Sequence, residues 1–109
     1  MTDQLPAPVQ AALDAANRND TGAFLDLFAG DGFVDDWGRT FTGRAAIQDW
    51  SDAEFIGKRV SLEVTEVSAG PDPADTVVTA QVGGDGFNGP SHFTFRTAGD
   101  QLASMTIRA

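Results

Sequence analysis

The second half of the chain is dominated by apolar and polar residues that alternate one by one between clusters of turn-forming residues. Residues 60–65 alternate in this way, the phase then slips at Val67, and further alternating runs cover 78–82 and 91–96, with a last strand expected over 102–108. The stretches AGPDPAD, GGDGFNG and AGDQ separate these runs and are rich in residues that form turns. A period of two puts successive side chains on opposite faces of a strand. The pattern predicts strands joined by hairpins, with a β-bulge near Val67.

The first half of the chain shows helical spacing instead. Two apolar stripes recur at intervals of three and four residues, which predicts two amphipathic helices. Their members are Val9, Ala12, Leu13 and Ala16, then Phe24, Leu25, Leu27 and Phe28. We expect the second helix to end at Gly30, because glycine readily takes the left-handed conformation found at helix ends.

A short hairpin and a third helix are expected between these two parts. Residues 32–41 read as extended chain broken by a Trp-Gly pair, which predicts a small hairpin. Helical spacing resumes over 46–50, and Ser51–Glu54 spells a capping box that would restart or kink the helix before Gly57 stops it. Helices followed by hairpin-linked strands predict an α+β fold with helices on one face of an antiparallel sheet.

Composition narrows the classes of function. The chain has 109 residues and 11.5 kDa, which fits a single domain over residues 1–109. Its net charge of -9 disfavours binding to nucleic acid. With one histidine and no cysteine, too few ligands are present for a transition metal, and we expect no cofactor. The N-terminal stretch MTDQLPAPVQ lacks signal-peptide features and no apolar run could span a bilayer, so we expect a cytoplasmic protein without membrane contact.

Three local stretches carry a resemblance to a known superfamily. They are AFLDLFAGDGFVDDWG at residues 23–38, FTGRAAIQDW at 41–50 and the closing GDQLASMTIRA. In this order of elements the chain resembles the nuclear-transport-factor-2-like superfamily, which includes ketosteroid isomerases and SnoaL-like polyketide cyclases. The resemblance implies a cone-shaped, strongly curved sheet, mixed or antiparallel, wrapped around three helices of a cystatin-like fold. It also implies an apolar cavity inside the cone and a homodimer formed through the outer face of the sheet.

The adjacent acids Asp35 and Asp36 are the first candidates for chemistry. Alternation along the strand puts Asp36 on the same face as Val34, with Asp35 on the other face towards solvent. The resemblance implies that Asp36 matches the aspartate that shuttles a proton in ketosteroid isomerases. Among Phe28, Phe41 and Trp50, its charged form would lose hydration, which suits the acid to abstracting and returning a proton near neutral pH. The alternative is structural, because Asp35 to Gly38 suits a type I turn and Arg39 or Arg44 could pair with either acid.

The remaining candidates would bind a ligand around Asp36. Five aromatic residues are expected at the wall, rim or entrance of the cavity and in contact with the ligand: Phe28, Trp37, Phe41, Trp50 and Phe55. The turn residue Phe87 could close over its mouth. Ser91 or His92 could donate a hydrogen bond to the ligand. Strand alternation points the His92 side chain outward, and it would face the cavity only if a bulge at Gly89-Pro90 shifted the alternation by one residue.

The chain contains no tyrosine, which in the isomerases donates a hydrogen bond to the reacting oxygen. Steroid isomerisation is therefore disfavoured. Two hypotheses stay open for a pocket that takes a small hydrophobic organic ligand. The first is a cofactor-independent isomerase, cyclase or dehydratase with Asp36 as base. The second is a non-catalytic ligand-binding or protein-association module.

Overall fold

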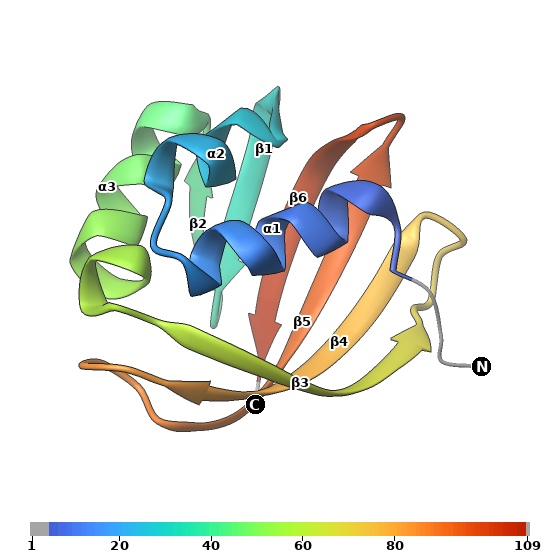
Figure 1. The fold of residues 1–109 in the computed structure, drawn as a ribbon. Coiled ribbons are helices and arrows are strands. Elements are labelled where there is room, and N and C mark those ends of the chain that lie inside the picture. The colour runs from blue at the N-terminus through green and yellow to red at the C-terminus, as the bar shows by residue number, and fades with distance from the viewer. Residues whose placement is uncertain (1–4, 109) are drawn as a thin grey trace.

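The computed structural model describes residues 5–108 and shows helices packed on one face of a single curled sheet (Figure 1). Residues 1–4 of the N-terminal stretch and the last residue of GDQLASMTIRA lie outside the described part. The helices are α1 (Ala7–Asn17), α2 (Thr21–Asp26) and α3 (Arg44–Glu54), followed by a short 3-10 helix, η1 (Ile56–Lys58). The strands are β1 (Phe28–Asp36), β2 (Arg39–Thr42), β3 (Ser61–Ala69), β4 (Asp75–Gly83), β5 (Gly89–Ala98) and β6 (Gln101–Arg108).

The sheet has six strands in the order β2-β1-β6-β5-β4-β3. Strand β1 runs parallel to β6, and every other neighbouring pair is antiparallel. The sheet curls around the helices without closing (Figure 1), which confirms the predicted α+β cone with a mixed sheet. The β1–β6 pairing joins the early hairpin to the late strands, so that side chains from both halves of the chain meet on the inner face.

Two details of the strand prediction are confirmed. The β1–β2 hairpin turns at Trp37-Gly38, where Gly38 has a φ of 89° that a residue with a side chain rarely adopts. The register of β3 against β4 shifts between Val64 and Glu66, so that Thr65 is the extra residue of a bulge.

The second helix is shorter than predicted, and the expected end at Gly30 is wrong. Helix α2 ends at Asp26, and Phe28 and Gly30 belong to β1. The carbonyl of Leu27 already accepts a 2.7 Å hydrogen bond from the backbone of Leu102 in β6. Pairing with the neighbouring strand therefore takes over where the apolar stripe alone predicted another helical turn.

The predicted restart of the third helix at Ser51 is also wrong. Helix α3 is continuous through Glu54, and Ser51 is fully buried within it. The Ser51 hydroxyl accepts a hydrogen bond from the backbone of Ile56 at 3.4 Å, so it binds beyond the C-terminal end of the helix instead of capping a new one. A Cβ at Gly57 would overlap the carbonyl of Asp52, so only glycine lets η1 turn back this tightly under α3.

The core lies between the helices and the inner face of the sheet. Its largest fully buried side chains come from both layers and include four phenylalanines: Phe24, Phe28, Phe93, Phe95, Ile47, Leu102 and Met105. No helix within residues 5–108 is long and apolar enough to cross a membrane. The cytoplasmic location stays a prediction.

Candidate functional site

A cavity of about 420 Å³ opens at one end of the sheet, between the α3–η1 segment and the ends of the strands. Its floor consists of buried and mostly apolar residues: Trp50, Phe55, Val60, Val82, Ser91, Phe93 and Ile107. Its rim consists of exposed residues: Trp37, Arg39, Ala53, Glu54, Lys58, Gly86 and Phe87. A largely apolar cavity with a few polar groups is the usual character of a site for a small organic molecule.

Asp36 is the more buried of the two acids that line this cavity, and its position follows from strand geometry. It is the last residue of β1 and shares a face with Val34, which is fully buried. Its partner across the hairpin is Arg39, and its neighbour on the parallel strand is Ile107. Side chains at directly paired positions lie close together on the same face. The sheet therefore places an arginine beside Asp36 and an apolar wall on its other side.

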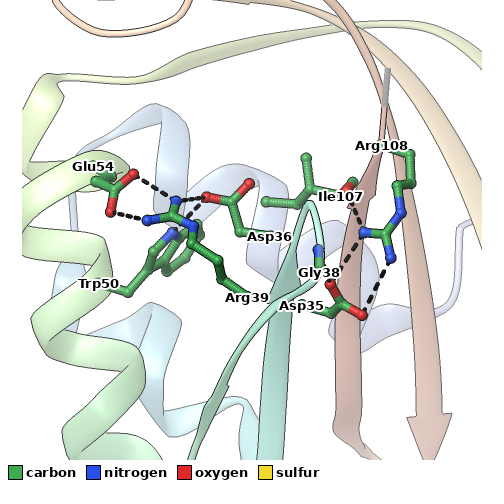
Figure 2. Close-up of polar contacts among 8 residues, drawn as sticks. All are labelled: Asp35, Asp36, Gly38, Arg39, Trp50, Glu54, Ile107 and Arg108. Atoms are coloured by element: carbon green, nitrogen blue, oxygen red, sulfur yellow. Dashed lines mark hydrogen bonds and ion pairs between the residues drawn. The ribbon is translucent and has the colours of Figure 1, made fainter.

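A polar cluster surrounds this acid (Figure 2). The Arg39 guanidinium donates to Asp36 Oδ2 at 2.6 Å and to both carboxylate oxygens of Glu54 at 2.7 and 2.9 Å. The indole Nε1 of Trp50 donates to Asp36 Oδ2 at 3.0 Å. Trp50 and Glu54 are one helical turn apart on α3, so both face the hairpin. Arg39 therefore holds two carboxylates from different elements.

These contacts stabilise the charged forms of Arg39 and Glu54. Hydrogen bonds from Arg39 lower the pKa of the Glu54 carboxyl, and the bonds to Glu54 and Asp36 raise the pKa of the Arg39 guanidinium. Both hydrogen bonds to Asp36 end on Oδ2, which leaves Oδ1 without a donor among the described residues. The Asp36 side chain is 15% exposed and lines the cavity, so Oδ1 is its available hydrogen-bond acceptor.

Asp35 has a different role, as its position on the opposite face of the strand predicted. Its carboxylate accepts hydrogen bonds from Arg108 at 3.1 and 3.3 Å and from the backbone of Gly38 at 2.8 Å. The bonds from Arg108 are the main reason that its pKa is lowered. Figure 2 shows Asp35 and Asp36 pointing to opposite sides of the strand. Asp35 closes the turn and ties β1 to β6, and it does not line the cavity.

Three of the residues predicted for ligand binding do not line the cavity. Phe28 is fully buried in the core, where its ring meets Phe24 edge to face. The ring of Phe41 packs against that of Trp50, with centroids 6.1 Å apart, and is not part of the lining. His92 is exposed on the outer face, where its Nδ1 lies 2.9 Å from the Thr79 hydroxyl. The start of β5 contains no bulge, so the His92 side chain points to the outer face, as strand alternation predicts.

The other predicted positions do line it. Asp36, Trp50, Phe55 and Ser91 form its inner part, and Trp37 stands at the rim with 60% of its surface exposed. The rings of Trp50 and Phe55 stack at 4.9 Å, which fixes the indole that bonds Asp36.

Sequence reasoning missed several lining residues. Phe93 could have been found, since it shares the strand face of Ser91, and Glu54 could have been found from its i,i+4 spacing to Trp50. Ile107 and Lys58 gave no such signal, because their places depend on the parallel β1–β6 register and on the packing of η1.

Solved structures with the same architecture cover nearly the whole chain. A candidate polyketide cyclase from Sinorhizobium meliloti matches with a TM-score of 0.82 and 29% identity over 95% of both chains. A protein with a ketosteroid isomerase-like fold from Catenulispora acidiphila, in complex with trimethylamine, matches with a TM-score of 0.78 and 27% identity. The match covers 97% of this chain and 87% of that protein. A Mycobacterium tuberculosis protein in complex with estradiol-17beta-hemisuccinate matches with a TM-score of 0.79 and 17% identity. The match covers 97% of this chain and 95% of that protein. No protein-family model and no curated protein matches the sequence.

These likenesses and the curled mixed sheet define the class. The chain belongs to the nuclear-transport-factor-2-like superfamily, with the SnoaL-like and ketosteroid isomerase-like proteins, as its sequence predicted. Its fold is one that binds small ligands in related proteins.

Proposed function

We propose that the chain binds a small, largely hydrophobic organic molecule in this cavity and that Asp36 exchanges a proton with it. One observation carries the proposal: a mostly apolar cavity of about 420 Å³ contains a single half-buried carboxylate with one oxygen available. The steroid ester bound by the Mycobacterium tuberculosis protein supports a ligand of this kind.

The proposed chemistry needs no cofactor. The Asp36 carboxylate removes a proton from a carbon next to a carbonyl group and returns it to a second position of the same molecule, so that no electrons are lost or gained. Ser91 is the buried hydroxyl of the lining and donates a hydrogen bond to the carbonyl oxygen on which charge develops. Return of the proton at the second position is an isomerisation. If the carbanion instead expels a hydroxyl group of the same molecule, the reaction is a dehydration, and if it attacks another carbonyl of that molecule, the reaction is a cyclisation.

The contacts of Asp36 favour a second candidate, a non-catalytic ligand-binding module. Its carboxylate is already held in place by hydrogen bonds from Arg39 and Trp50 to Oδ2, which suits it to a fixed binding group. In that role the free Oδ1 accepts a hydrogen bond from a ligand hydroxyl or amine and orients it, without turnover.

Asp36→Asn separates these candidates, with Asp35→Asn as its matched control. The control makes the same change at the next residue, on the opposite side of the strand. A panel of small aromatic and alicyclic ketones is first screened by thermal shift, and binders are then tested for proton exchange with deuterated water by NMR. We expect exchange in the native chain and in Asp35→Asn, and a loss of about 100-fold or more in Asp36→Asn.

The outcomes are distinct. Binding without exchange in the native chain supports the non-catalytic module. Exchange that survives Asp36→Asn contradicts Asp36 as the base. A panel that produces no thermal shift at all contradicts the binding function.

We also propose that two copies associate through the outer face of the sheet. The helices cover the other face (Figure 1), and the middle of the outer face carries the neutral, half-buried residues Val77, Thr94 and Thr106 on adjacent strands. His92 and Thr79 lie on the same face. Light scattering should give twice the 11.5 kDa chain mass at micromolar concentration, and Thr94→Arg should reduce it to one chain. A native chain that runs as a monomer contradicts this interface.

A further inference from the structure

Lys58 is the single lysine of the chain, and its ammonium has no partner among the described residues. The other basic side chains there are engaged. Five arginines form ion pairs and the sixth bonds a carbonyl: Arg18, Arg39, Arg59, Arg96 and Arg108, then Arg44 with the Phe28 oxygen. In a chain with 16 acidic and seven basic residues, a cation without a carboxylate partner is unexpected.

The fold holds this residue on the rim of the cavity. The Lys58 backbone donates to the Phe55 carbonyl at 3.0 Å and accepts from Asp85 at 2.8 Å, which anchors it to the residue that follows α3 and to the β4–β5 loop. Its methylene stem lies against Gly86, where a Cβ would come within 3.3 Å of Lys58 Cγ. The stem therefore packs against the β4–β5 loop, and Lys58 is exposed to solvent.

The rest of the lining determines which ligand this cation suits. Arg39 is already neutralised by Asp36 and Glu54, so Lys58 is the lining cation that remains available. A single ammonium matches one negative charge. The two carboxylates of the same lining repel a dianion such as a phosphate monoester more strongly than a monoanion.

We propose that the ligand is an amphipathic monoanion, a hydrophobic molecule with one carboxylate, whose charged group binds Lys58 at the rim while its apolar body fills the cavity. This inference rests on the proposed binding function. Lys58 then sets the orientation of the ligand, with the carboxylate outward and the opposite end near Asp36.

Matched carboxylate and primary amide pairs test the proposal by calorimetry. Phenylacetate, naphthoate and decanoate are each compared with their own amide. The native chain should bind the carboxylate of at least one pair about fivefold more tightly than its amide, the scale of one exposed ion pair. Lys58→Gln should abolish this preference and Lys58→Arg should keep it. The matched control Arg59→Gln removes the same charge from the next residue, which does not line the cavity, and should also keep it. The preference should fall as salt concentration rises.

The failures can be told apart. Equal or tighter binding of the amides overturns this inference and leaves the binding function standing. Equal loss of preference in Lys58→Gln and Arg59→Gln overturns it as well, because net charge alone would then explain the effect. If neither form of any pair binds, the binding function itself is contradicted, and this inference with it.

Discussion

Asp75–Arg96 and Asp36–Arg39 are both carboxylate–arginine pairs between residues directly opposite each other on antiparallel strands, and they differ in how much of the carboxylate is used. Asp75 lies opposite Arg96 in the β4–β5 hairpin, at the other end from the cavity, and each of its two oxygens accepts a hydrogen bond from that arginine at 2.8 or 3.1 Å. Asp36 lies opposite Arg39 and uses only Oδ2. The first pair is closed and its carboxylate is almost fully buried, whereas the second leaves one oxygen open to a cavity. The same cross-strand geometry thus serves structure in one place and supplies a binding group in the other.

The two pairs should differ most in the unfolding free energy that is lost when the aspartate of each is replaced by asparagine. Asp75→Asn leaves an amide NH₂ group facing the guanidinium in a site where the side chain is 3% exposed. We expect the free energy of unfolding to fall by about 2 kcal/mol, less than for a fully buried pair because Arg96 is half exposed. Asp36→Asn should cost under about 1 kcal/mol, because an amide oxygen can still accept from Arg39 and Trp50. Urea denaturation measures both values, and equal costs would remove the distinction.

The same contrast predicts how stability depends on pH. Hydrogen bonds from Arg96 lower the pKa of Asp75 in the folded state below its unfolded value of about 3.9. A lowered folded pKa stabilises the protein above the unfolded pKa, and this contribution is lost as pH falls through the folded pKa. The difference in unfolding free energy between the native chain and Asp75→Asn should therefore be full near pH 6 and shrink below about pH 4. A difference that does not change with pH would show that the charge of Asp75 is not what stabilises the fold.

A smaller effect is expected when Asp36 loses one of its two donors. Trp50→Phe keeps an aromatic ring against Phe55 but removes the 3.0 Å bond to Asp36 Oδ2. We expect a cost of about 1 kcal/mol in unfolding free energy, with ligand binding retained because Oδ1 is unchanged. Thermal and chemical denaturation give the cost, and calorimetry with a ligand from the screen gives the affinity. Loss of binding would mean that the indole contacts the ligand directly.

The smallest effect should come from the exposed carboxylate of the cluster. The side chain of Glu54 is 43% exposed, and its ion pair with Arg39 is screened by water. Glu54→Gln should change the unfolding free energy by at most about 0.5 kcal/mol and leave Asp36 paired with Arg39. A larger cost would indicate that Glu54, and not Asp36, is the main partner of Arg39.

Strand geometry explains why the fold and Asp36 were predictable from the sequence. Alternation along β1 placed Asp36 with buried Val34, and turn-forming residues located every hairpin, because both signals are local. Phe28 was misassigned because a helical stripe and the start of a strand look alike until β6 is present to pair with it.

The surroundings of Asp36 were harder to predict because they are brought together by packing. Arg39 was recognised as one of two arginines that could pair with either acid, but its bridge to Glu54 depends on how α3 lies against the hairpin. Lys58 reaches the rim only through the tight turn at Gly57. Phe41 was expected on the wall itself, but it packs against Trp50, and Trp50 lines the cavity.

The most direct measurement follows the carboxyl carbons of Asp36 and Asp75 by NMR while a cavity ligand is added to the native chain. The open oxygen of Asp36 should contact the ligand, so its resonance should move in proportion to the bound fraction, while that of Asp75 should stay in place. If the ligand saturates the protein and the Asp36 resonance does not move, Asp36 does not touch the ligand and its proposed role is wrong.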